Sequence, residues 1–159
     1  MRLSILVVFL SPLTSIPCKK NSSSPHVYSG VITHFDDDVY QCYEWNGKAK
    51  DAMKSGHLFA AANYKLASPD PSKYKSEFKL DCGVGNYDCI KQADGREYML
   101  IDWCDKSNCD FHSAGHADIL VEFEDLDTDE CVLGCDGYDT FKNKWTIVPC
   151  SNQLNPDDF

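Results

Sequence analysis

The chain carries nine cysteines in 159 residues, and this feature constrains its fold more than any other. One of them, Cys18, lies just after an apolar leader. The other eight form an even set in the body of the chain: Cys42, Cys82, Cys89, Cys104, Cys109, Cys131, Cys135 and Cys150. In an oxidising compartment such a set predicts disulfides rather than metal ligands, although the sequence alone allows many different pairings.

The leader predicts that oxidising compartment. Met1-Arg2 is followed by the apolar residues 3–10 and then by small and polar residues, which is the order of a secretory signal peptide. The apolar stretch is shorter than the roughly 20 residues that a membrane-spanning helix needs. We therefore expect residues 1–17 to be a signal peptide and the mature protein to be secreted, extracellular and without a membrane partner. Cleavage within residues 15–19 leaves the fate of Cys18 open.

Spacing along the chain favours short disulfides. It suggests three close pairs and one long bridge: Cys82 with Cys89, Cys104 with Cys109, Cys131 with Cys135, and Cys42 with Cys150. The long bridge would stabilise the fold most, by about 3 to 5 kcal/mol in the chain-entropy model.

Zinc is the alternative for one group of residues. Cys104, Cys109, His112 and His116 lie close together in the sequence, and all four side chains can bind zinc. Only the two histidines have helical spacing, however, and secreted cysteines are usually oxidised. We expect disulfides here, with no metal and no other cofactor.

The length fits one domain with a single hydrophobic core. After the signal peptide, residues 18–39 form a polar leader that includes a possible extra strand. Residues 40–150 form the folded domain, and residues 151–159 are expected to be a loose tail. We expect a monomer.

Within this domain the sequence predicts one helix followed by several strands. Residues 47–62 carry alanines and other apolar residues near helical spacing, with Asn46 as a possible N-cap and Gly56 as a weak point. Six segments have strand composition: residues 27–33, 74–80, 97–103, 119–123, 131–133 and 144–148. This order predicts an α+β fold, with one N-terminal helix packed on a twisted antiparallel β-sheet.

The formal net charge of −10 limits the partners that the protein can bind. A phosphate backbone would be repelled at long range, which argues against a non-specific nucleic-acid binder with a basic surface. A pocket that recognises one base stays compatible with this charge, because local geometry can outweigh the mean field.

A series of short motifs resembles one protein family. The motifs, in chain order, are Tyr40-Gln41-Cys42, the alanine-rich segment 52–57, Pro71-Ser72-Lys73-Tyr74, the strand 96–101, the turn 113–118 and Val148-Pro149-Cys150. In this order they resemble the guanyl-specific fungal ribonucleases and the related ribonuclease-like effectors of plant-pathogenic fungi. The resemblance covers residues 40–150 and implies the microbial ribonuclease fold, with a bridge between its first and last cysteines, here Cys42 and Cys150.

The resemblance also implies which catalytic groups are present. Glu97 matches the position of the family's general base. Ser72, Ile119 and Cys135 stand at positions where the family has a histidine, an arginine and a general-acid histidine. None of these three can supply the missing proton transfer or phosphate clamp. One catalytic function of four would remain.

The expected function is therefore that of a secreted effector without efficient catalysis, which binds a host protein or RNA in fungal virulence, with delivery into host cells as one route of action. Tyr74 and Tyr98 are the residues expected to stack on RNA bases, although most aromatic residues of so small a domain lie in its core. A first alternative is a weak, guanyl-preferring endoribonuclease that pairs Glu97 with a histidine: His57, His112 or His116. A second alternative is a secreted carrier of small apolar ligands, similar to a lipocalin.

Overall fold

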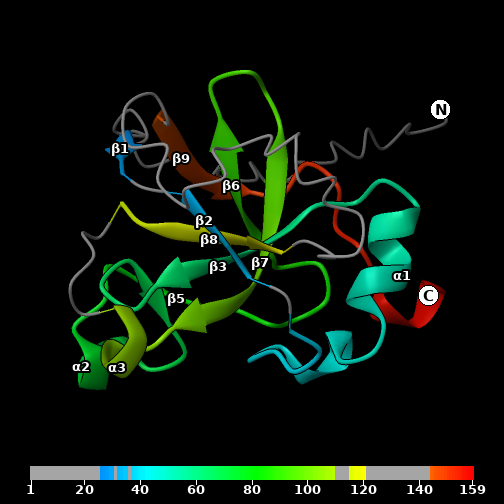
Figure 1. Ribbon diagram of the computed structural model, residues 1–159, viewed down its shortest axis with the longest axis horizontal. Coiled ribbons are helices and arrows are strands. Elements are labelled where there is room, and N and C mark those ends of the chain that lie inside the picture. Colours follow the sequence, from blue (N-terminus) through cyan, green and yellow to red (C-terminus); the bar gives the residue numbers. More distant parts are fainter. Residues whose placement is uncertain (1–25, 31, 36, 110–114, 121–143) are drawn as a thin grey trace, which may run out of the picture.

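The computed structural model describes residues 26–30, 32–35, 37–109, 115–120 and 144–159 (Figure 1). These residues form a mixed α+β fold around a sheet with the strand order β1-β9-β6-β7-β3-β8-β2. The strands of this sheet are β1 (Tyr28–Ser29), β2 (Ile32–Phe35), β3 (Phe59–Asn63), β6 (Asp88–Gln92), β7 (Glu97–Cys104), β8 (Ala117–Leu120) and β9 (Lys144–Pro149). A second, two-stranded sheet pairs β4 (Ala67–Ser68) with β5 (Phe78–Lys79).

The helices of the described residues are all short. They are η1 (Tyr43–Trp45), α1 (Ala49–Lys54), α2 (Pro71–Tyr74), α3 (Lys106–Cys109) and η3 (Pro156–Asp158). In Figure 1, α1 lies beside the C-terminal end of the chain, whereas α2 and α3 lie together at the other side of the molecule. Within the described ranges, no helix is long and apolar enough to span a membrane.

The main sheet is mixed, which corrects the expectation of an antiparallel sheet. The central strand β3 runs parallel to β7 on one side and antiparallel to β8 on the other, and β2 runs parallel to β8. A parallel pair needs a long connection between its strands. Residues 64–96, which include α2 and β6, provide that connection between β3 and β7.

The predicted helix over residues 47–62 is also corrected. The helix α1 covers only Ala49–Lys54, and Gly56, with a φ of +88°, follows its end in the left-handed region. Glycine adopts this conformation at little cost, and the chain then enters β3 as an extended strand. All five residues of β3 are buried. Alanine has high helix propensity, but here its small side chain suits a strand enclosed between two neighbours, so packing overrides propensity.

Other predicted strands are present with shifted ends. The strands β7 and β9 match the segments 97–103 and 144–148 closely, and β8 begins two residues before the segment predicted to start at residue 119. The segment 74–80 contains the end of α2 and only the short β5, whereas residues 131–133 lie outside the described part of the chain. The predicted extra strand 27–33 is divided between β1 and β2, which pair with β9 and β8 at opposite edges of the sheet.

The core contains large aromatic side chains from distant parts of the chain. Trp45 is fully buried and contacts Phe59 and Tyr87 at ring-centroid distances of 4.9 and 6.2 Å. Phe159 packs against the same indole at 6.0 Å. The last nine residues are thus part of the fold instead of a loose tail, and buried Leu154 adds to this packing.

Three disulfides join the described cysteines: Cys42–Cys82, Cys89–Cys150 and Cys104–Cys109. The short bridge between Cys104 and Cys109 is the pairing expected from spacing. The expected pairs Cys42–Cys150 and Cys82–Cys89 are wrong, because sheet pairing decides which cysteines meet. The antiparallel register of β6 and β9 places Cys89 opposite Val148, so that the chain leaves β9 with Cys150 beside Cys89. Both cysteines of the expected pair Cys131–Cys135 lie in the undescribed segment 121–143.

Candidate functional site

The four positions that the ribonuclease resemblance marked as catalytic lie in different settings. Glu97 begins β7, and Ser72 lies in α2, where its hydroxyl donates to the Asp70 carboxylate at 2.7 Å. The side chain of Ile119 is buried in β8. Cys135 lies outside the described residues. The structure does not combine the described members of this group into one cavity, since Glu97 and the residues of α2 line different pockets.

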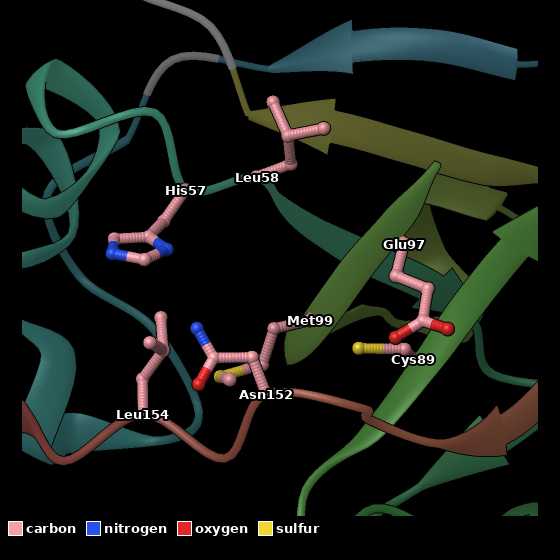
Figure 2. Close-up of a pocket in the computed structure, with 7 residues that line it drawn as sticks. All are labelled: His57, Leu58, Cys89, Glu97, Met99, Asn152 and Leu154. Atoms are coloured by element: carbon pink, nitrogen blue, oxygen red, sulfur yellow. The ribbon is translucent and has the colours of Figure 1, made fainter. Parts of the chain in front are cut away.

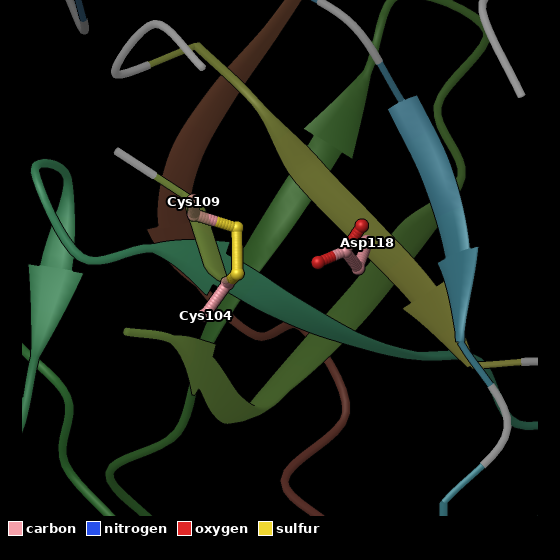
Figure 3. A group of neighbouring side chains, drawn as sticks. All are labelled: Cys104, Cys109 and Asp118. Carbon is pink, nitrogen blue, oxygen red and sulfur yellow. A yellow bond between two sulfur atoms is a disulfide. The ribbon is translucent and has the colours of Figure 1, made fainter. Parts of the chain in front are cut away.

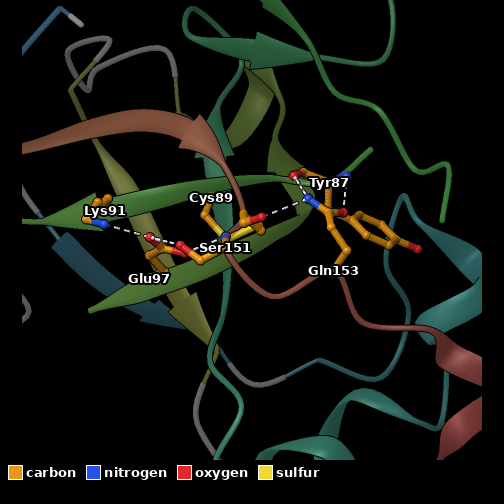
Figure 4. Close-up of a disulfide and its surroundings, with 7 residues drawn as sticks. Tyr87, Cys89, Lys91, Glu97, Ser151 and Gln153 are labelled. Carbon is orange, nitrogen blue, oxygen red and sulfur yellow. Dashed lines mark hydrogen bonds and ion pairs between the residues drawn. A yellow bond between two sulfur atoms is a disulfide. The ribbon is translucent and has the colours of Figure 1, made fainter. Parts of the chain in front are cut away.

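Glu97 is held by three protein groups (Figure 4). Its carboxylate accepts hydrogen bonds from the Lys91 ammonium, the Ser151 backbone N–H and the Ser151 hydroxyl, each at 2.8 Å. Its side chain is 16 % exposed. Mainly because of Lys91, and then of Ser151, the pKa of Glu97 is lowered to about 2. This carboxylate ties the segment after β9 to the sheet, and at neutral pH it is a weak proton acceptor.

The cavity beside Glu97 is small. Its lining also includes His57, and Figure 2 shows the two side chains at opposite sides of the group, with Met99 and Asn152 drawn between them. The volume is about 60 Å³. A cavity of this size has room for a few water molecules and is too small for a nucleotide. Of the other proposed histidine partners, His116 is buried elsewhere and His112 lies outside the described residues.

A larger pocket, with a volume of about 330 Å³, lies on the side of the molecule that carries α2 and α3. We call it the lysine pocket, and its lining residues are Tyr64, Lys65, Lys73, Tyr74, Lys75 and Lys106. They come from the turn after β3, from α2 and its C-cap, and from α3. Its volume falls at the lower end of the range, about 300 to 1,000 Å³, that is usual for small-molecule sites.

Local backbone geometry positions the lysines of α2. Asp70 caps this helix, and its carboxylate accepts a hydrogen bond from the Lys73 N–H at 3.2 Å. Pro71 occupies the first turn, where the lack of an N–H does no harm. Lys75 ends the helix in the left-handed conformation, with a φ of 51°. The capped turn presents Lys73 and Lys75 to one pocket, although they are only two positions apart.

The Tyr74 side chain of the lysine pocket packs against a second aromatic residue. The Tyr74 ring contacts the Trp103 ring at a centroid distance of 4.6 Å. The Trp103 indole N–H in turn donates to the Gln41 side-chain oxygen at 3.1 Å. The Lys73 ammonium lies 4.8 Å from the centre of the Tyr74 ring, within the range of a cation–π contact. The Lys73 ammonium therefore lies over the Tyr74 ring at the pocket.

The lysine pocket concentrates positive charge in an acidic chain. Four of its six lining residues are lysines, whereas the whole chain has a net charge of −10. No acidic side chain of the described residues lines it, and within the same residues Lys75 and Lys106 form no ion pair. Positive groups of this kind attract phosphate, sulfate or carboxylate ligands.

Of the two tyrosines expected to stack on RNA, the structure makes one available. Tyr74 lines the lysine pocket. Tyr98 is only 2 % exposed and lies in the core, so it presents no ring to a ligand. Sequence reasoning missed the lysines, although the run Lys73-Tyr74-Lys75 was a local signal. Lys65 and Lys106 come close to these two lysines only in the folded chain. The net charge of the whole chain, which is negative, gives no sign of the four lysines.

Comparisons with family models, with curated proteins and with solved structures gave no match for this chain.

Proposed function

We propose that this protein is a secreted, catalytically impaired binding protein that holds single-stranded RNA through the lysine pocket. The observation that carries the proposal is the convergence of four lysines and two tyrosines from three segments on one pocket. Lysines supply contacts to phosphate groups, and the partly exposed Tyr74 ring can stack on a base, a contact worth about 1 to 3 kcal/mol. Tyr64 is buried and only lines the pocket. RNA carries both groups, a phosphate and a base, in every nucleotide.

Two sequence features support the remaining parts of this proposal. The apolar leader and the disulfides agree with secretion. The ordered motif series resembles ribonuclease-like effectors, and this favours RNA over other polyanions. The mixed sheet and the pairing of Cys150 with Cys89 depart from what that resemblance implied, so the proposal depends on the pocket more than on the fold.

The contacts of Glu97 argue against the weak-ribonuclease alternative. A general base works best with a pKa near the operating pH, and a group with a pKa of about 2 removes protons poorly at neutral pH. Any substrate would also have to displace Lys91 and Ser151 from the carboxylate. The Glu97 region is therefore a structural contact in this proposal.

The lining of the lysine pocket argues against the carrier alternative. Pockets for apolar ligands are lined mainly by hydrophobic side chains. The lysine pocket is lined by four ammonium groups and two phenols, whose desolvation by an apolar ligand would be costly.

Fluorescence anisotropy with a labelled single-stranded RNA tests the proposal. We expect Lys73→Glu/Lys106→Glu to weaken binding at least about 10-fold and to reduce the slope of log Kd against log salt by about 1 to 2, since two phosphate contacts are lost. The matched control is Lys79→Glu/Lys144→Glu, which changes the net charge equally at exposed lysines outside the pocket.

Each result has a definite meaning. A selective loss in the Lys73/Lys106 variant supports the proposal. Equal weakening in both variants would show that only overall charge matters, and the proposed site would be wrong. Absence of RNA binding, together with binding of an acidic peptide that depends on Lys73 and Lys106, would move the assignment to a protein partner.

A further inference from the structure

A partly buried cluster of donor atoms lies between β7, α3 and β8. The Cys104 and Cys109 sulfurs and a carboxylate oxygen of Asp118 all lie within 4.8 Å of one another. Figure 3 shows one oxygen of Asp118 directed toward the disulfide that joins the two sulfurs. Thiolate sulfur and carboxylate oxygen are both ligands of zinc.

His116 packs against this cluster of three donors. Its side chain is 2 % exposed. Its Nδ1 lies 3.6 Å from the Cys109 sulfur, and its Nε2 lies 3.2 Å from the Asp118 carboxylate. The two ring nitrogens face different neighbours, so His116 cannot share one metal ion with both the sulfurs and Asp118. It instead holds the Asp118 carboxylate in place beside the sulfurs.

The backbone fixes these groups before any metal binds. The Asn63 side-chain amide donates to the Cys109 carbonyl at 3.1 Å, and the Tyr64 N–H donates to the Cys104 carbonyl at 2.9 Å. On the other side, the Asn63 N–H donates to the His116 carbonyl at 3.2 Å. The end of β3 thus holds both cysteines and the histidine from one place, which is the preorganisation that a metal site needs.

We propose that the reduced form of this cluster binds Zn²⁺ through Cys104, Cys109 and Asp118, with a water molecule as the fourth ligand, in place of the Cys104–Cys109 disulfide. A disulfide alone does not require a carboxylate oxygen directed at its sulfurs, whereas a zinc ion bound by both thiolates uses that oxygen as a ligand. The contact between His116 Nε2 and Asp118 then orients the carboxylate. The site is distinct from the lysine pocket, and its existence does not depend on RNA binding.

Zinc can replace the disulfide only after reduction, and a thiol compound supplies the electrons. Two thiol molecules reduce the Cys104–Cys109 bond to two protein thiols and form one disulfide between themselves. Zinc then displaces one proton from each of these thiols, because only thiolates bind the metal. An oxidising compartment keeps the disulfide, and a reducing compartment that contains zinc favours the metal.

The test is metal binding by the full chain during graded reduction. A phosphine reductant is added in the presence of one equivalent of Zn²⁺, and native mass spectrometry measures bound metal while alkylation and peptide mapping identify the reduced cysteines. We expect one zinc ion on the molecules in which Cys104 and Cys109 are reduced. Replacement of zinc by Co²⁺ should give a thiolate-to-cobalt charge-transfer band and the visible absorption of a tetrahedral site.

Matched variants identify the ligands. We expect Cys104→Ser/Cys109→Ser to abolish binding, and the nearly isosteric Asp118→Asn to weaken it by at least about 10-fold. His116→Ala removes the group that orients Asp118 and should lower the zinc affinity, whereas His26→Ala, at an exposed histidine, should leave it unchanged. Circular dichroism of every variant confirms folding.

Two results would overturn the proposal. One is reduced Cys104 and Cys109 without bound metal in a protein that circular dichroism shows to be folded. The other is equal zinc binding by the wild type, Cys104→Ser/Cys109→Ser and Asp118→Asn, which would place the metal on other groups.

Discussion

Glu97 and the lysine pocket differ in whether other groups of the protein compensate their charge. At Glu97 one carboxylate receives an ammonium, a backbone N–H and a hydroxyl from within the protein. In the lysine pocket four ammonium groups gather around one space, and no acidic side chain of the described chain lines it. A charge that the protein satisfies by itself stabilises the fold, whereas a group of like charges around a cavity is suited to an external ligand. This difference, more than residue type, separates the structural contact from the binding site.

The largest expected effect concerns the Cys89–Cys150 disulfide, which belongs to the Glu97 side of this comparison. Cys89→Ala/Cys150→Ala opens a loop with a sequence separation of 61, and we expect it to lower the free energy of unfolding by about 4 kcal/mol. Cys104→Ala/Cys109→Ala, near the lysine pocket, opens a separation of 5 and should cost about 2 kcal/mol. Urea denaturation measures both. A larger loss for the second variant would contradict the chain-entropy explanation.

Glu97→Gln tests whether this carboxylate is structural. We expect a loss of about 2 to 3 kcal/mol in unfolding free energy at pH 7, with no RNA cleavage above background in either protein. Because the folded-state pKa is lowered from 4.5 to about 2, the stabilisation is complete above pH 4.5 and disappears as the pH falls toward 2. Urea midpoints of both proteins across this range should converge at the acidic end.

Asp51→Asn is the control for Glu97→Gln, because Asp51 forms an exposed ion pair with Lys54. Such pairs contribute little, so its effect should stay below about 1 kcal/mol. A different outcome is that the wild type cleaves RNA and Glu97→Gln does not. Glu97 would then be a catalytic base and not a structural contact.

A change of Tyr74 should affect binding more than stability. Tyr74→Ala removes the ring beside Lys73, and we expect RNA affinity to fall by about 1 to 3 kcal/mol. Tyr43→Ala, at a tyrosine that is 72 % exposed and outside the pocket, should leave the affinity unchanged. Anisotropy titrations compare the two variants. Equal losses would mean that Tyr74 has no special place in RNA binding.

The smallest effect concerns the cap that positions the lysine pocket. Asp70→Ala removes the acceptor of the Lys73 N–H, and we expect it to lower the midpoint of thermal unfolding by a few degrees and to weaken RNA binding a few-fold. Asp70→Asn keeps a capping side chain and should retain most of both properties. Thermal unfolding and anisotropy measure them. An unchanged affinity in Asp70→Ala would show that the cap does not position the lysines.

The sequence predicted those features that depend on local pattern. The strands β7 and β9 carry β-forming residues, and the α+β class followed from such strands after an early helix. The interior of the sheet could not be predicted in this way. Ala60, Ala61 and Ala62 favour a helix by themselves, and only their place between β7 and β8 makes them a strand.

The same distinction, between local sequence pattern and arrangement in the fold, applies to the candidate site. Tyr74 could be named from the sequence, because an aromatic residue beside two lysines is a local feature. The contribution of Lys106 depends on the arrangement of α2 and α3, and the burial of Tyr98 depends on the packing of β7. The pairing of Cys89 with Cys150 likewise follows from the register of β6 with β9, which no spacing rule contains.

The connectivity of two disulfides has a consequence for the order in which the chain matures during its synthesis. Cys42 and Cys82 both leave the ribosome before Cys89, whereas the partner of Cys89 is made 61 positions later. During that interval the cysteine nearest to Cys89 in sequence is Cys82. Early closure of the Cys42–Cys82 bridge would remove Cys82 as a wrong partner, so that Cys89 waits for Cys150 and the strand β9 that precedes it.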